Sequence, residues 1–99
     1  MNSSIVIALP KIDDAKKIRT ILNRHGFSVA AVCSTASTAL ASMSELDGGI
    51  LICGYKLTDR YYRDVLEDIP SYFEMLLLAS GRVIAEAPTS VLTVEMPMK

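Results

Sequence analysis

Short runs of consecutive apolar residues alternate along this chain with longer segments in which apolar residues recur at helical spacing. The runs lack polar alternation, which is typical of strands buried on both faces of a sheet. A strand, a helix and a further strand in succession form a parallel pair joined by a right-handed crossover. The alternation therefore predicts an α/β domain with a parallel sheet and helices on both faces.

The apolar runs predict five strands. Pro10 ends the first of them, because proline cannot donate to the hydrogen-bond ladder of a central strand. The expected strands lie at residues 5–9, 27–33, 50–53, 75–79 and 91–94.

Residues 12–24 predict a first helix with an apolar face and an opposite basic face. The apolar positions are Ile12, Ala15, Ile18, Ile21 and Leu22, and the basic ones are Lys16, Lys17, Arg19 and Arg24. Asp13 and Asp14 lie in the first turn, where the helix dipole favours acids, so we interpret them as dipole partners and not as metal ligands. Gly26 is expected to let the chain leave the helix in a left-handed conformation.

Two further helices are predicted. Ser34 or Thr35 is expected to cap the second, which ends before Asp47. Thr58 or Asp59 is expected to cap the third, at about residues 60–68. Residues 81–88 have apolar side chains for one or two turns of a fourth helix at most.

Composition excludes several classes of protein. With 99 residues, 51% hydrophobic and 21% charged, the chain is expected to form one ordered domain over residues 1–99. A net charge of −1 disfavours direct nucleic-acid binding. Two cysteines do not make a disulfide scaffold, and neither a membrane span nor a secretory signal is visible. We expect a soluble, cytoplasmic protein. Its mean hydropathy of +0.34 is high for so small an interior.

Ligands of open α/β sheets bind beyond the carboxyl ends of the strands. The residues expected there are Leu9, Pro10, Lys11, Cys53, Gly54, Tyr55, Ala79, Ser80, Gly81, Glu95, Met96 and Pro97. They include no histidine, and no glycine-rich phosphate loop follows any strand. This set is poor for catalysis, and we do not expect an enzyme.

The stretches IVIALPKIDDAKKIRTILNRHGFSV and GGILICGYKLTDRYYRDVL resemble receiver domains of response regulators. The resemblance runs from about Ser4 to Lys99. It implies a flavodoxin-like, doubly wound sheet of five parallel strands in the order 2-1-3-4-5. It also implies a phosphorylation site with an acidic pair that binds Mg²⁺ after the first strand, an aspartate after the third, a hydroxyl residue after the fourth and a lysine followed by proline after the fifth.

This sequence departs from that pattern at almost every position. The corresponding residues are Leu9 and Pro10, Gly54, Ala79 beside Ser80, and Glu95 or Met96. Gly54 supplies no nucleophile, and Leu9 and Pro10 supply none of the oxygen ligands that Mg²⁺ requires. Glu95 would repel a phosphoryl group. The resemblance therefore implies a degenerate pseudo-receiver without aspartyl phosphorylation, metal or cofactor.

The GYKLTD loop, the FEMLLLAS strand and the VEMPMK end narrow the resemblance to the pseudo-receivers of ANTAR-type antitermination regulators. In such regulators the domain precedes a coiled coil and an RNA-binding module. We therefore expect a non-catalytic signalling module that acts by dimerisation or partner binding in transcription control. The fifth helix of a receiver and any output domain are expected to be missing, either because the chain is a fragment or because a homodimer covers the open sheet face.

A small-metabolite sensor is the alternative function. Its pocket would use the space left by Gly54. The expected lining is Leu9, Cys53, Gly54, Tyr55, Ser80, Glu95, Met96 and Pro97.

Other conspicuous residues have plain structural interpretations. Cys33 and Cys53 are expected to be buried, and His25 to lie on the surface. Of Tyr61 and Tyr62, one is expected to pack on the sheet. The basic face of the first helix is read as a solvated surface, with an acidic partner or RNA as the alternative. The Met96–Pro97 bond is expected to be cis.

Overall fold

The structure is a computed structural model that describes residues 4–79 and 91–95. Strands and helices alternate along the chain, as the sequence predicts. The elements are β1 (Ser4–Ala8), α1 (Ile12–Arg24), β2 (Val29–Cys33), α2 (Ala36–Ser44), β3 (Gly49–Gly54), α3 (Tyr62–Asp68), β4 (Phe73–Ala79) and β5 (Leu92–Glu95). The predicted short helix at residues 81–88 and the predicted cis bond at Met96–Pro97 lie outside the described residues.

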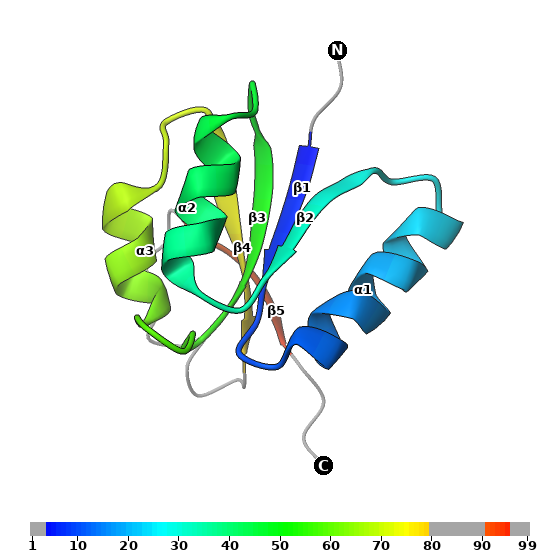
Figure 1. The fold of residues 1–99 in the computed structure, drawn as a ribbon, viewed down its shortest axis with the longest axis horizontal. Helices are drawn as coiled ribbons and strands as arrows, with labels where there is room; N and C mark the ends of the chain where they lie inside the picture. The colour runs from blue at the N-terminus through cyan, green and yellow to red at the C-terminus, as the bar shows by residue number, and fades with distance from the viewer. Residues whose placement is uncertain (1–3, 80–90, 96–99) are drawn as a thin grey trace.

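The strands form one parallel sheet in the order β2-β1-β3-β4-β5, which confirms the predicted topology. The sheet runs between two helical layers, with α2 and α3 on one side and α1 on the other (Figure 1). All strands run the same way, so their carboxyl ends share one edge. That edge carries the candidate site.

Two apolar layers hold the fold together. The layer between the sheet and α2–α3 contains fully buried Met43, Leu51, Tyr62, Val65 and Leu77. The layer under α1 is smaller and centres on Ile5, Ile7, Leu9, Ala15 and Ile52. Each fully buried side chain of this size stabilises the fold by about 1.5–3 kcal/mol.

The start of β3 depends on two adjacent glycines. Gly48 and Gly49 have φ of +151° and +153°, which L side chains rarely adopt. A Cβ on Gly49 would overlap the carbonyl oxygen of Ser4, and one on Gly48 would lie 2.8 Å from the carbonyl oxygen of Tyr72. The missing side chains allow β3 to enter between β1 and β4.

Some boundaries differ from prediction. The second strand begins at Val29 instead of Phe27, because the Phe27 N–H still bonds to the Leu22 carbonyl as the chain leaves α1 through Gly26, at φ +87°. The third helix begins at Tyr62 instead of Arg60, because the carboxylate of Asp59 turns toward α2 and does not cap α3. No helix in the described ranges has the length and apolarity to cross a lipid bilayer.

Candidate functional site

The carboxyl ends of the strands bring most of the predicted site positions to one edge. Gly54 is the last residue of β3 and pairs with Leu78 of β4, while Ala79 ends β4 and pairs with Glu95 of β5. Leu9 follows β1 and is anchored by its N–H to the Cys33 carbonyl at 3.1 Å. Ser80, Met96 and Pro97 lie outside the described residues. The predicted grouping at this edge is therefore present for the positions that can be placed.

Gly54 lies directly against the two residues that follow β1. A Cβ on Gly54 would be 3.1 Å from Leu9 Cδ2 and 3.5 Å from Pro10 Cδ. Leu9 itself is buried beneath α1. The atoms nearest to such a Cβ are thus hydrocarbon, and the contact is apolar.

Cys53 faces the other side of the sheet from Leu9. It belongs to the apolar layer under α2 and α3, whereas Leu9 belongs to the layer under α1. The two side chains therefore lie on opposite faces of the sheet. The Cys53 thiol is fully buried and donates to the Gly54 carbonyl at 3.3 Å. Burial raises its pKa to about 12, so it stays a neutral core residue, as predicted.

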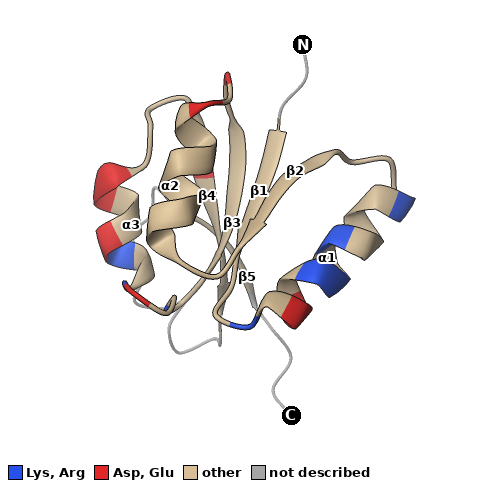
Figure 2. Ribbon diagram, viewed as in Figure 1, with Lys and Arg blue, Asp and Glu red and all other residues tan. Residues whose placement is uncertain are grey.

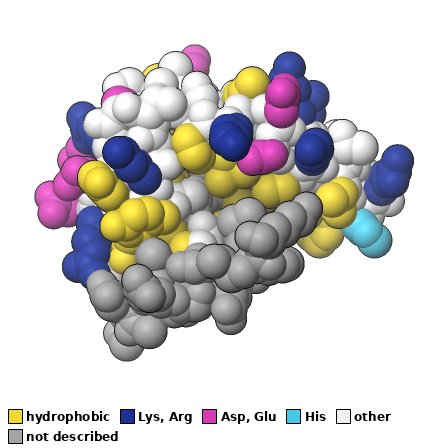
Figure 3. Space-filling model, turned by 90° about the horizontal axis from the view of Figure 1, so that it is seen from below, with side chains coloured by type: hydrophobic (Ala, Val, Ile, Leu, Met, Phe, Trp, Pro, Cys, Tyr) yellow, Lys and Arg dark blue, Asp and Glu magenta, His cyan; other side chains and the backbone are white. Residues whose placement is uncertain are grey.

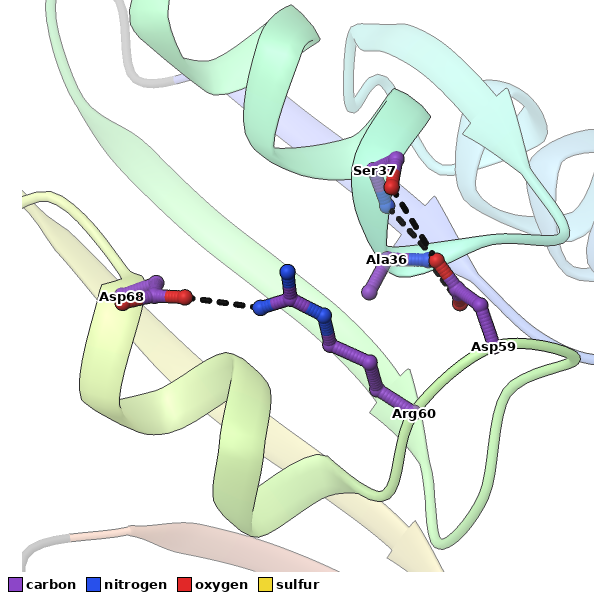
Figure 4. A network of polar contacts seen from close by, with 5 residues as sticks. All are labelled: Ala36, Ser37, Asp59, Arg60 and Asp68. Atoms are coloured by element: carbon purple, nitrogen blue, oxygen red, sulfur yellow. Dashed lines mark hydrogen bonds and ion pairs between the residues drawn. The ribbon is translucent and has the colours of Figure 1, made fainter.

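Asp59 corrects the sequence prediction. It does not cap the third helix; its carboxylate accepts from the backbone N–H groups of Ala36, at 2.7 Å, and Ser37, at 3.2 Å, at the start of α2 (Figure 4). The Ser37 hydroxyl donates to it as well. The N–H of Ala36 is the first cause that lowers the pKa of Asp59. We call this set of contacts the Asp59 clamp.

The clamp explains where the flanking helices begin. Thr35 caps α2 in the ordinary way by accepting from the Thr38 N–H at 3.2 Å. Four N–H groups at a helix start lack helical partners, so Asp59 satisfies donors that Thr35 leaves. With Asp59 turned toward α2, the third helix starts without a side-chain cap, one residue after Tyr61.

Residues 55–61, which we call the tyrosine loop, are fixed along their length. The Tyr62 N–H bonds to the Tyr55 carbonyl at 3.0 Å, and the Leu57 N–H bonds to the Arg60 carbonyl at 2.7 Å. Leu57 is buried in the core, and the Thr58 hydroxyl donates to the Ser34 carbonyl at 3.0 Å. The loop is therefore part of the folded framework and presents its remaining side chains in fixed positions.

Three tyrosines gather on and beside this loop. The rings of Tyr55 and Tyr61 meet edge to face, with centroids 5.3 Å apart. Tyr62 is buried and Tyr61 exposed, so one of the pair packs on the sheet as predicted. The ammonium of Lys56 lies 5.3 Å from the centre of the Tyr61 ring. In the view onto the strand ends, hydrophobic side chains gather in the middle of this end with basic side chains beside them (Figure 3).

The other residues singled out in the sequence lie on the surface or in the core as predicted. His25, Asp13 and Asp14 are exposed, the two acids in the first turn of α1 as predicted, and Cys33 is buried. Within residues 4–79 and 91–95, no three His, Cys, Asp or Glu side chains come together as a metal-binding group would require.

The sheet face beyond α1 is incompletely covered by the described helices. α1 packs on β1 and β2 (Figure 1). Leu76 and Leu78 of β4 continue this face and are partly buried. Leu92 and Val94, their partners on β5, are 51% and 45% exposed. The described part of this face thus carries apolar side chains in contact with water.

Solved structures share this fold. The chain matches the anti-anti-sigma factor PhyR from Bartonella quintana with a TM-score of 0.79, at 16% identity and over 98% of this chain. It spans 42% of that protein's length. The PhyR receiver domain from Erythrobacter litoralis matches with a TM-score of 0.68, at 14% identity over 99% of this chain and 81% of that one. A receiver domain protein from Bacillus halodurans matches with 0.67, at 18% identity over 100% and 88%.

These identities establish a likeness of fold, namely that of response-regulator receiver domains. No protein-family model matches the sequence, and no curated protein matches it significantly. What the site positions can do chemically must therefore be argued from the residues themselves.

Two features of the site were missed from sequence. The Asp59 clamp joins residues more than 20 positions apart, so local capping rules could not find it. The aromatic contact of Tyr55 with Tyr61 arises because the loop folds back on itself through the bridge between Lys56 and Tyr61. The only sequence signal for it is the density of tyrosines in GYKLTDRYY.

Proposed function

We propose that this chain is a non-catalytic signalling module with a receiver fold, which acts through protein contacts in a transcription or antitermination regulator without aspartyl phosphorylation. The observation that carries the proposal is the contact of Gly54 with Leu9 and Pro10 at the strand ends. The resemblance assigns carboxylates to all three positions. One structural neighbour is named an anti-anti-sigma factor, which is in keeping with a role in transcription control.

Phosphotransfer to a carboxylate needs its nucleophilic oxygen and a cation that offsets the charge of the phosphoryl group. Glycine has no side-chain oxygen, and neither leucine nor proline can ligate Mg²⁺. Cys53, the neighbouring thiol, is buried and neutral, so it is no substitute nucleophile. The chemistry thus lacks both components at the described positions, and signalling is left to binding.

We further propose that the module forms a homodimer through the sheet face beyond α1. Leu76 and Leu78, with Leu92 and Val94 beside them, supply an apolar strip on that face. Burial of apolar surface stabilises association by about 25 cal/mol per Å². A second copy would bury the exposed parts of β5, which gives the dimer its driving force.

Incubation with acetyl phosphate and Mg²⁺ tests the first proposal, with a phosphorylatable receiver domain as the positive control. Intact-mass spectrometry is expected to show no phosphoryl adduct on this chain while the control is labelled. Stoichiometric acyl phosphate on any aspartate, Asp59 included, would overturn it. Sedimentation equilibrium tests the dimer: we expect a dimer at micromolar concentration that Val94→Glu converts to a monomer, and a wild-type monomer would contradict it.

A further inference from the structure

We propose that the basic face of α1 is an interaction surface for a second copy of this chain, which docks its acidic helices α2 and α3 there, so that copies associate head to tail. The inference rests on the proposed function and deepens it, because it names a partner for the protein contacts of the module. It concerns a polar contact, separate from the apolar strip on β4 and β5 that carries the proposed dimer.

The charged side chains of the chain are divided between the two sides of the sheet. Residues 9–35, which contain α1, carry five Lys or Arg residues and two Asp residues, which is a net charge of +3. Residues 36–72, which contain α2 and α3, carry six acids and three bases, which is a net charge of −3. Most basic residues of the described ranges thus lie on and beside α1, and most acidic ones on the opposite side of the sheet (Figure 2). Each copy therefore carries both halves of a charge-complementary contact.

The basic face consists of Lys16, Lys17 and Arg24. All three are exposed, and they lie opposite Ala15 and Leu22, which pack toward the sheet. No carboxylate of a described residue lies within ion-pair distance of these three cations. Their positive charge is therefore not neutralised within the described part of one chain, and it can attract the carboxylates of another copy.

The acidic face is formed by the outer side of α3 and the end of α2, which pack side by side on the sheet (Figure 1). Its exposed acids are Asp64, Glu67, Asp68, Glu45 and Asp47. The first two lie opposite Tyr62 and Val65, which are buried against the sheet. Asp68 is held by Arg60 at 2.7 Å (Figure 4). Beyond this pair, four acids remain beside one base, Arg63, so the face attracts cations.

Each face also borders a large exposed apolar side chain. Ile21 lies one helical turn from Lys17 and is 53% exposed. Tyr72 is 48% exposed and lies beside Gly48, which follows Asp47. Burial of such side chains at the contact adds to the attraction between the charges. A nucleic acid can use the basic face alone, whereas a second copy engages both faces, and this favours the second copy.

The positions of the two faces determine the form of the association. α1 and the pair α2–α3 cover opposite sides of the sheet, so a contact between them joins unlike surfaces and repeats from copy to copy without closing (Figure 1). Exposed ion pairs contribute little each and are screened by salt. The association should therefore be weak, grow with protein concentration and disappear at high salt, whereas a dimer held by apolar contacts persists.

Sedimentation equilibrium of the full 99-residue chain tests the proposal at low and high ionic strength. The Debye length is about 30 Å at about 0.01 M salt and about 3 Å at about 1 M. We expect the average mass at low salt to rise with protein concentration above its value at high salt. The variant K17Q/E67Q, whose net charge equals that of the wild type, is expected to weaken the salt-dependent step about threefold to tenfold.

Two variants that each lack one face give a sharper test by nuclear magnetic resonance. K16Q/K17Q keeps the acidic face and D64N/E67Q keeps the basic face, so each alone should associate weakly, while their mixture can form one native contact. In labelled K16Q/K17Q, addition of unlabelled D64N/E67Q is expected to shift the amide signals of α3 and the end of α2, and not those of α1. The reverse labelling should shift the signals of α1 alone.

Matched controls keep the outcome decisive. Lys56 and Glu74 are exposed and lie outside the two faces, so K56Q/E74Q, again with an unchanged net charge, should associate like the wild type. Circular dichroism verifies that each variant is folded. An average mass independent of salt, equal weakening by both charge-neutral double variants, or no shift of the α3 signals in the mixture would each overturn the proposal.

Tighter binding of α1 to a thymidine oligonucleotide than to a second copy would overturn it as well. The average mass at high salt tests the proposed dimer, and the acetyl phosphate experiment tests the absence of phosphorylation. Failure of the head-to-tail contact is thus distinguishable from failure of the proposed function.

Discussion

Two leucines on the neighbouring strands β4 and β5 should differ sharply in their contribution to stability. Leu77 on β4 is fully buried between the sheet and the helices α2 and α3, whereas Leu92 on β5 is 51% exposed on the opposite face. Leu77→Ala removes buried hydrocarbon and leaves a cavity, so we expect a loss of about 3 kcal/mol. Half of the Leu92 side chain is already in water, and Leu92→Ala should therefore cost at most about 1 kcal/mol in the monomer.

Urea denaturation followed by circular dichroism measures the loss of unfolding free energy in both variants. With a slope near 1–1.5 kcal/mol per molar urea, typical of a domain of this size, Leu77→Ala should lower the midpoint by about 2–3 M and Leu92→Ala by less than about 1 M. Leu77→Met, which keeps the volume, should lose less than about 1.5 kcal/mol and shows whether the cavity causes the effect.

The variants Leu77→Ala and Leu92→Ala also test the proposed dimer when their stability is measured at several protein concentrations. At submicromolar concentration Leu92→Ala should be mild, and at high concentration its cost should grow because the wild type gains stability from association. The cost of Leu77→Ala should not depend on concentration in this way. A large loss for Leu92→Ala at the lowest concentration would show that β5 is covered within a single chain, and the reasoning for the dimer would fail.

Four further changes have definite outcomes. Because the pKa of Asp59 is lowered in the folded chain, the clamp stabilises fully above the ordinary value of 3.8 and is lost as pH falls through the folded value. Asp59→Asn should lower the melting temperature by a few degrees at pH 7, and its melting temperature should fall less with acid than that of the wild type. Gly49→Ala should cost more than about 3 kcal/mol of unfolding free energy in urea, because its Cβ meets the Ser4 backbone. Gly26→Ala, also at positive φ but with no atom within 4 Å, should cost about 1 kcal/mol. Iodoacetamide at pH 8 should leave Cys53 unmodified in the native chain and alkylate it in urea, as mass spectrometry would show.

The succession of strands and helices was predictable because it depends on local patterns, whereas the order of the strands in the sheet came from the resemblance to receiver domains. Apolar runs mark buried strands, and Gly26 marks the end of α1 through a conformation that other residues avoid. The Asp59 clamp was not predictable in this way. Asp59 stands next to a helix in sequence, yet its carboxylate reaches the start of another one, since the crossover topology places the end of β3 beside the start of α2. Only the tertiary structure shows at which of the two helices the Asp59 carboxylate accepts hydrogen bonds.

The resemblance assigned the site positions, but the sequence could not give the surroundings of their side chains. Sequence alone left open whether Gly54 bordered a cavity for a metabolite. The structure places the side chain of Leu9 close to Gly54, because its Cδ2 atom would be only 3.1 Å from an added Cβ. The opposite orientation of Cys53 follows from the alternation of side chains along a strand, which sends neighbours to different faces.

The apolar contact at the strand ends also explains why the departures from the receiver pattern occur together. A carboxylate at position 54 alone would project toward Leu9 and Pro10, and neither side chain can hydrogen-bond to it or carry a balancing charge. An acid at position 9 would in turn be buried beneath α1, where Leu9 now packs with Ile7 and Ala15. A charge at position 9 or 54 would be costly without a partner charge or a cation. The two buried positions therefore favour either carboxylates balanced by a cation or apolar residues, and Leu9 and Gly54 fit the second in the proposed pseudo-receiver.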